Sequence, residues 1–389
     1  MEVTAAVPIY KDRTFYAPRF EIRLQGRKLG RAVIRDVLEV TYTDSMKELD
    51  SFEFTLNDWD PVLHEPRYSS PYDDRGQQKK LEDGSDVPNF DPGAKVELYL
   101  GYYPDELHLV MTGTVVSISP SFPSSGTPRL KIRALNPLYT LQRKQETMTF
   151  ENKSDSEIAR EIGQKLDIAV EIPPGQESTE TKHPYILIDN EYPINFLMSR
   201  ALRLGYDLYI KQPEDGDPVL FFGKTTTNSV TYELTWGRTL VEFTPTVKTK
   251  GQVTRVTVRG WLPGKKGNEQ KVEEVAQIRD VNLNLPDPKL AEAIDAALKE
   301  NHDEVVNDPI ESREEARQKA IGLLEDRLKD LVTGQGSTVG LPDLRAGRTV
   351  VIKGIGFRYS GRYLVTETTH TIGGGGYTTR FTARLEGPP

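Results

Sequence analysis

The sequence predicts an α+β protein that is mainly β, in which two barrel-like β domains are joined by a small α/β insert. From residue 18 to about 145, short apolar and polar alternations are separated by turn signals, as in half-buried antiparallel strands. Helix signals gather in the middle, at 146–228, and alternation returns toward the C-terminus. A chain of 389 residues is long enough for two or three domains with separate cores.

The composition excludes several classes of function. A net charge of −8 argues against a nucleic-acid-binding protein. The absence of cysteine excludes disulfides, thiolate metal sites and cysteine nucleophiles. No apolar run approaches the ~20 residues of a membrane helix, and the N-terminus lacks the pattern of a signal peptide. We therefore expect synthesis in the cytoplasm without a signal peptide.

The first β domain is expected at 18–145, after an N-terminal arm at 1–17. Apolar residues alternate around Phe20, Val40, Phe54, Leu98 and Ile132, which predicts a series of half-buried strands. Residues 61–93 are polar and rich in Pro, Gly and Asp, and we interpret them as a long loop excursion. Loops of that length are typically functional or disordered.

The insert at 146–228 carries the strongest helix signals. Ser154 and Glu157 have the spacing of a capping box, so a helix should begin there. A second helix is predicted over about 193–204, and Gly205 follows where a helix C-cap needs positive φ. A hairpin-like strand pair should complete the insert.

The second β domain is expected at 229–389, with helices at about 287–306 and 313–333, the latter capped at Ser312 and ended by Gly334. Charge is uneven in this part of the chain. Residues 248–271 hold seven Lys or Arg against one acid, and 292–315 hold nine acids against two Lys or Arg. Two solvated faces are the simpler interpretation. The alternative is that unlike faces meet in a ring or stack.

No motif supports catalysis, a cofactor or a metal. The five histidines lack H-x-x-x-H spacing, Gly223-Lys224-Thr225 lacks the earlier glycine of a phosphate loop, and Gly354-x-Gly356 lies between strand patterns rather than before a helix. Trp59 lies between two aspartates, which suggests sugar stacking, but packing at a barrel end is the simpler interpretation. His370 is expected to be a hydrogen-bonded strand residue rather than a ligand.

The order and spacing of several stretches resemble one known family. These stretches are LNDWD, GAKVELYLGY, TGTVVSISPSFPSSGTPRLKIRAL, TFENKSDSEIAREI, NFLMSRALRLGYDLYI and GLPDLRAGRTVVIKGIGFRYSGRYLVTETTH followed by GYTTRF. Together they span about Phe20 to Leu385 and resemble the phage late control gene D proteins, baseplate hubs of contractile tails, which are similar to the hub part of type VI secretion spike proteins. The residues that match this pattern, in structural rather than catalytic positions, are Trp59, Gly101, Tyr102, Gly113, Phe150, Asp155, Phe196, Gly205, Tyr206, Gly340, Pro342, Gly347, Gly361, Tyr363, His370, Gly376 and Tyr377.

The resemblance implies a non-enzymatic structural protein, a virion or injection-particle component that forms a homotrimeric hub ring. Such a ring connects a hexameric tail tube or tube-initiator ring, on one side, to a central trimeric spike on the other, and contacts other baseplate components. Spike proteins of the type VI kind continue past the hub, whereas this sequence ends at Pro389, so a separate spike is expected. The alternative is a tail-associated glycan- or receptor-binding module that uses Trp59 and the Tyr-rich loops. The phage, R-type bacteriocin and extracellular injection systems all remain open.

Overall fold

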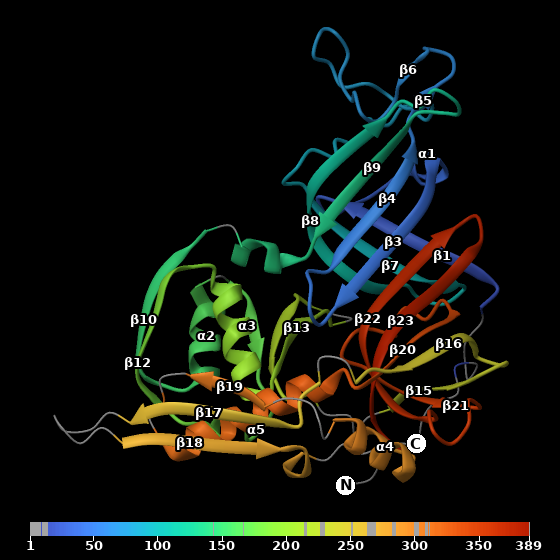
Figure 1. The fold of residues 1–389 in the computed structure, drawn as a ribbon. Coiled ribbons are helices and arrows are strands. Elements are labelled where there is room, and N and C mark those ends of the chain that lie inside the picture. Colours follow the sequence, from blue (N-terminus) through green and yellow to red (C-terminus); the bar gives the residue numbers. More distant parts are fainter. Residues whose placement is uncertain are drawn as a thin grey trace.

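The computed structural model describes residues 9, 15–142, 144–165, 167–213, 216–225, 230–249, 252–262, 270–281, 285–298, 303–307, 310 and 312–388 (Figure 1). Strands dominate, with five α-helices and three short 3-10 helices in this part of the chain, so the predicted mainly β, α+β class is confirmed. None of the described helices is long and apolar enough to cross a membrane.

The largest element is a sheet of thirteen strands that contains both β-rich arms. Its first arm runs in the order β2-β1-β7-β8-β9-β4-β3, with strands β1 (Ala17–Leu24), β2 (Arg27–Lys28), β3 (Val37–Ser45), β4 (Ser51–Asn57), β7 (Lys95–Tyr103), β8 (His108–Ser121) and β9 (Arg129–Leu135). Its second arm continues as β22-β23-β20-β16, with β21 and β15 branching from β22; these strands are β15 (Val230–Thr235), β16 (Leu240–Val247), β20 (Val332–Val339), β21 (Thr349–Lys353), β22 (Gly361–Gly373) and β23 (Gly376–Gly387).

The two arms are joined directly, rather than only through the insert. β3 pairs antiparallel with β22 over a register from Ser45↔Glu367 to Glu39↔Gly373. We call this junction the seam. The pairings among the described residues form one open, branched sheet, and neither arm closes into the barrel that the sequence suggested. Sequence reasoning missed the seam because its two strands are more than 300 residues apart.

The first arm follows the alternation of its sequence. Every second residue along these strands, including Ile22, Val40, Phe54 and Leu98, is buried in a single core, and the residues between them are more exposed. The short helix α1 (Arg31–Asp36) adds Val33 to this core. Strand patterning in this region was therefore a reliable predictor.

The 61–93 excursion is built around turns and buried polar contacts. Only β5 (Trp59–Asp60) and β6 (Glu65–Pro66) at its start are regular. Asp58, fully buried, accepts hydrogen bonds from the backbone N–H groups of Tyr68 at 2.6 Å and Ser69 at 3.1 Å. Tyr68, Leu81, Val87 and Phe90 enter the core of the first arm. The excursion is thus an ordered part of this arm.

The insert has a core of its own between two small sheets and two helices. Its elements are the 3-10 helices η1 (Pro137–Gln142) and η2 (Glu177–Thr179), the strands β10 (Glu146–Lys153), β11 (Ala169–Glu171), β12 (His183–Glu191), β13 (Asp207–Lys211) and β14 (Val219–Gly223), and the helices α2 (Asp155–Lys165) and α3 (Pro193–Leu204). The capping box forms as predicted: Ser154 N–H donates to the Glu157 carboxylate at 2.8 Å, and Glu157 N–H donates to the Ser154 hydroxyl at 3.3 Å. Gly205 ends α3 with φ of 66°. Strand β12 was missed because HPYILIDNE follows a stretch rich in Pro, Glu and Thr.

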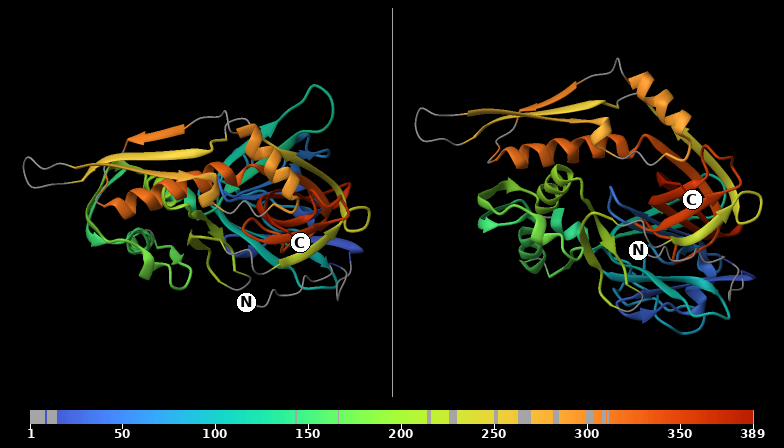
Figure 2. Two further views of the ribbon diagram at one scale, coloured as in Figure 1. Left: turned by 60° about the horizontal axis from the view of Figure 1, so that its bottom comes forward. Right: turned by 90° about the horizontal axis from the view of Figure 1, so that it is seen from below.

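A further layer of the second arm covers the insert. The strands β17 (Arg255–Leu262), β18 (Gln270–Gln277) and β19 (Asp303–Asn307) form a sheet, followed by η3 (Ile278–Asp280), α4 (Pro288–Leu298) and α5 (Arg313–Lys329). Two expectations need correction here: the end of the 287–306 range is strand β19, and Gly334 lies inside β20 rather than at a helix end. Figure 2 shows α5 lying between this sheet and the insert.

α5 meets α3 at a close backbone contact. A Cβ added to Gly322 would lie 2.9 Å from the carbonyl oxygen of Arg203. At this point the backbones of the two helices are in contact, with no side chain between them. Nearby, the buried carboxylate of Asp207 on β13 accepts from Lys329 at 3.3 Å and Arg384 at 3.4 Å. These contacts fix the insert against the second arm.

We predict that Gly322→Ala destabilises the protein by ~1–2 kcal/mol, because the clash with a backbone oxygen outweighs the ~1 kcal/mol gained in helix propensity. Urea unfolding measures the change. Gly374→Ala is the control, because a Cβ there meets no atom within 4 Å. A Gly322→Ala protein more stable than the wild type would show that the helices separate at no cost.

Candidate functional site

The seam contains a buried ion pair that connects β3 to the loop between β20 and β21. The Asp44 carboxylate is 2% exposed and accepts from Arg345 Nε at 2.7 Å and from the Ala346 N–H at 3.0 Å. Its other oxygen accepts from the hydroxyl of Thr368 on β22. A single carboxylate therefore joins three segments that are distant in the sequence.

Arg345 extends this contact to a tyrosine. Its Nη2 donates to the Tyr42 hydroxyl, and its guanidinium lies 5.0 Å from the centre of the Tyr42 ring. Burial lowers the pKa of Arg345, but its interactions with Tyr42 and Asp44 more than compensate and raise it above its ordinary value. Arg345 is thus a charged group inside the protein, paired and hydrogen-bonded as such groups must be.

His370 lies next to this pair and is fully hydrogen-bonded. Its Nε2 is 3.1 Å from the Leu344 carbonyl oxygen, which can only accept, so Nε2 carries the proton. Its Nδ1 then acts as the acceptor, with the hydroxyl groups of Tyr377 at 3.0 Å and Thr379 at 3.1 Å within reach as donors. Burial lowers the pKa of His370 to about 4. The geometry is that of a neutral structural histidine, the role that the sequence suggested.

The tyrosines of the seam pack on a glycine. A Cβ added to Gly340 would lie 2.1 Å from Tyr377 Cγ, so only glycine fits. The Tyr102 hydroxyl donates to the Gly340 carbonyl oxygen at 3.0 Å, and the Tyr102 and Tyr377 rings stack with centroids 5.5 Å apart. Strand β7 of the first arm thereby contacts β23 of the second.

The structure brings some of the predicted pattern residues together at or beside the seam. These are Tyr102, Gly340, His370, Gly376 and Tyr377. Pro342, Gly347, Gly361 and Tyr363 lie elsewhere in the second arm. Gly101 and Gly113 lie in strands of the first arm, and Phe150, Asp155, Phe196, Gly205 and Tyr206 lie in the insert. Trp59 lies apart at the start of the excursion, half-buried and edge-on to His64 at 6.3 Å.

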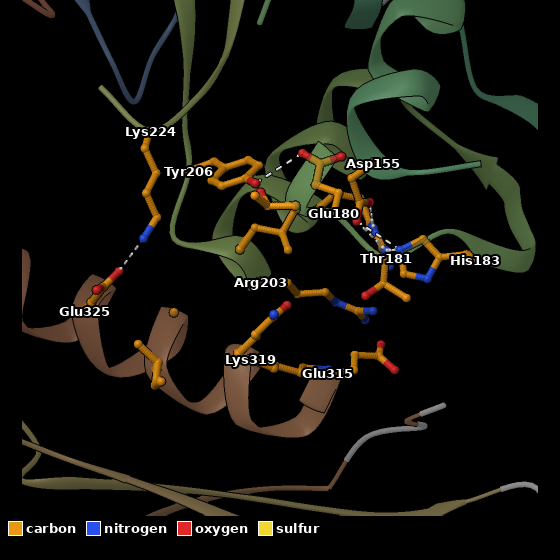
Figure 3. Close-up of a pocket in the computed structure, with 16 residues that line it drawn as sticks. Asp155, Glu180, Thr181, His183, Arg203, Tyr206, Lys224, Glu315, Lys319 and Glu325 are labelled. Atoms are coloured by element: carbon orange, nitrogen blue, oxygen red, sulfur yellow. Dashed lines mark hydrogen bonds and ion pairs between the residues drawn. The ribbon is translucent and has the colours of Figure 1, made fainter. Parts of the chain in front are cut away.

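A second candidate site is a pocket of about 250 Å³ between the insert and α5 (Figure 3). At its base, Arg200 forms a two-pronged contact with Asp155, and its Nη2 lies 3.0 Å from Asp155 Oδ2. His183 Nε2 is 3.0 Å from the same oxygen. Burial alone would raise the pKa of Asp155, but the contacts from His183 and Arg200 lower it below its ordinary value.

A second carboxylate of the pocket caps a helix. Glu180 accepts from the backbone N–H of Ser156 at 2.8 Å, from the Ser156 hydroxyl at 2.6 Å and from the Tyr206 hydroxyl at 3.1 Å. A carboxylate at the N-terminus of α2 is favoured by the helix dipole. The Ser156 hydroxyl donates to Glu180 and not to His183. Ser156 and His183 therefore do not form the nucleophile–base pair of a serine hydrolase. The arrangement holds α2, α3 and β12 together.

Among the described residues, no three His, Cys, Asp or Glu side chains are grouped as a metal site. Sequence reasoning identified Asp155 and His370 but missed Arg200, which pairs with Asp155, and the Asp44–Arg345 pair beside His370. No local pattern marks those residues, since each is defined by a partner far along the chain.

We expect Arg345→Leu to cost ~3–5 kcal/mol of unfolding free energy, because it leaves Asp44 charged and unpaired inside the protein. The matched control is Lys47→Ala, which removes an ion pair to Asp330 whose side chains are 64% and 48% exposed. That control should change stability by less than ~1 kcal/mol. Equal effects of the two variants in chemical unfolding would contradict the central role of the seam pair.

A pH prediction concerns Asp50, which accepts from the Ser45 N–H at 3.1 Å. Burial and the neighbouring Asp44 charge raise the pKa of Asp50 to about 7, from 3.8. Between these values the folded state holds the proton that the unfolded state releases, so this group's contribution to stability falls as pH rises. The lowered pKa of His370 makes its contribution to stability rise with pH, in a pH range that overlaps that of Asp50. The test is therefore the difference in unfolding free energy between an Asp50 variant and the wild type at each pH.

The stability of Asp50→Asn relative to wild type should therefore increase from pH 4.5 to pH 7.5, by at most roughly 1.4 kcal/mol per unit of pKa shift. Unfolding curves across this range measure it. Parallel curves would mean that Asp50 is ionised in the folded protein throughout.

Comparison with known structures shows the same fold in tail proteins. The 43 kDa tail protein of prophage MuSo2 from Shewanella oneidensis is 12% identical, with 95% of this chain and 98% of the other covered and a TM-score of 0.63. A tail protein from Neisseria meningitidis MC58 is 14% identical, with 95% and 97% covered and a TM-score of 0.67. The E. coli c3393 protein, a type VI secretion component described as similar to the T4 tail proteins gp27 and gp5, is 12% identical, with 94% and 76% covered and a TM-score of 0.53.

These matches confirm, at the level of the fold, the resemblance to phage tail hub proteins. No curated protein gives a significant match to the sequence. The model of one family, described as the Alg8 N-terminal domain, matches residues 73–374, which is more than half of the chain. The chain belongs to that family.

Proposed function

We propose that the protein is a structural baseplate hub of a contractile injection machine. Three copies form a ring that connects the hexameric tail tube, or a tube-initiator ring, to a separate trimeric central spike. The fold shared with tail proteins over nearly the whole length of the chain is the observation that carries this proposal. The shared fold of the E. coli c3393 protein, a type VI secretion component with structural similarity to the T4 tail proteins gp27 and gp5, supports the same class of machine.

The role is mechanical rather than enzymatic. The polar side chains at the seam hydrogen-bond to one another, and so do those in the insert pocket. In both places these contacts stabilise the fold. The seam joins both arms into one sheet, so a load applied to one arm passes to the other through a row of backbone hydrogen bonds. Such stiffness suits a part that holds tube and spike in line.

The proposed partners follow from this position. They are two further copies of the chain, the spike, the tube side and the surrounding baseplate components. The particle is a phage-tail-like virion or an extracellular injection particle. Permanent interfaces of this kind typically bury more than ~2,000 Å².

The test is the mass of the purified protein by light scattering over a hundred-fold dilution series. We expect a particle of three times the 43.8 kDa chain that persists on dilution. Co-purification with a co-expressed candidate spike follows as the second measurement. A stable monomer at every concentration, with or without the spike, would contradict the hub.

A further inference from the structure

Two aromatic side chains are exposed on neighbouring turns of the second arm. Trp236, between β15 and β16, is 59% exposed, and Phe357, between β21 and β22, is 71% exposed. The backbones of the two turns touch: Trp236 N–H donates to the Lys353 carbonyl oxygen at 3.0 Å. Exposed Trp with nearby Arg is the composition of interface hot spots rather than of ordinary surface. We call residues 235–239 and 353–362 the aromatic turns.

The aromatic turns are preformed and positively charged. The Ser360 N–H donates to the Gly356 carbonyl oxygen at 3.0 Å, which closes the second turn. The two segments contain Arg238, Lys353, Arg358 and Arg362 and no acid. Lys353 pairs with Glu233 at 2.7 Å and Arg358 with Asp287 at 3.0 Å, so the four cations of the turns counted with these two carboxylates leave a net charge of +2. This surface fits a partner that is apolar and acidic.

Such a surface exists on the same chain, in the 61–93 excursion. Val62 and Leu63, in the turn between β5 and β6 at its start, are 83% and 65% exposed. The segment contains seven acids and four Lys or Arg, a net charge of −3. The turn is held in place by Asp60, which accepts from the N–H groups of Val62 at 2.9 Å and Leu63 at 3.0 Å. Two exposed aliphatic residues on an acidic loop match the character required.

These surfaces cannot meet within one molecule. In Figure 1 the β5–β6 region stands at one end of the molecule, and the β15–β16 and β21 turns lie toward the opposite end. Contact between them therefore requires two copies, arranged head to tail, and a head-to-tail contact closes into a ring when its rotation allows.

We propose that the aromatic turns of one copy bind the 61–93 loop of the next, with Trp236 and Phe357 packed against Val62 and Leu63. The opposite charges of the two segments orient the contact and exclude self-pairing of like surfaces. This inference rests on the proposed trimer and specifies which surfaces close it.

The experiment uses the full chain and light scattering over a dilution series. One variant is Trp236→Ser with Phe357→Ser, and a second is Val62→Ser with Leu63→Ser. Tyr185→Ser is the matched control, because Tyr185 is 54% exposed but lies on β12 of the insert. All four substituted side chains of the test variants are exposed, so unfolding curves should match the wild type.

We expect each double variant to raise the concentration of half-dissociation at least ten-fold, and the control to behave as wild type. An equimolar mixture of the two double variants should form dimers and no larger ring, because each pair of chains retains one intact contact. High salt should weaken the wild-type ring.

Three results would overturn the proposal. If the wild type and both double variants are equally trimeric, the hub proposal is retained and the proposed contact is wrong. Weakening by only one of the two double variants rejects the pairing of these two surfaces. A wild type that is monomeric at every concentration, with or without the spike, contradicts both the hub and the contact.

Discussion

The buried pair of Asp44 and Arg345 is the interaction on which the architecture depends. It fixes the loop after β20 against β3, while Thr368 on β22 contacts the same carboxylate. A buried ion pair is not by itself a strong source of stability, because desolvation offsets most of the attraction. Its value here is positional. Thr368 of β22 lies opposite Asp44 and donates to its carboxylate, which favours one register of β3 against β22, and Arg345 fixes the loop after β20 to the same point. A shift by one residue would turn every side chain of the strand to the wrong face.

The insert is attached by a different principle. Its own core is apolar. Its junction with the second arm includes the glycine contact at Gly322, the Asp207 carboxylate with its two cations, and an apolar cluster of Tyr209 and Phe221 with Leu364. The arms therefore form one continuous body through the sheet, and the insert is a separate core docked on it through α5 and through this apolar cluster.

Much of the fold could be predicted from local sequence. Alternation at Ile22, Val40 and Leu98 located strands, and the capping box at Ser154 and Glu157 located the start of α2 within one residue. The seam was invisible because nothing near Val40 or Ile372 indicates which strand each one pairs with. Arg345 was missed for the same reason. The exposed pair Trp236 and Phe357 was also missed, since the sequence drew attention to Trp59, which is half-buried.

The position of β22 at residues 361–373 has a consequence for synthesis on the ribosome. The first arm can complete its other pairings as soon as it emerges, but the outer side of β3 has no partner until nearly the whole chain has been made. During that interval its unpaired N–H and C=O groups offer an open template to any other extended segment. Nascent chains close together on one messenger would then be at risk of exchanging β22, so slow translation of the last third would favour aggregation, and chaperone binding near β3 would protect the nascent chain.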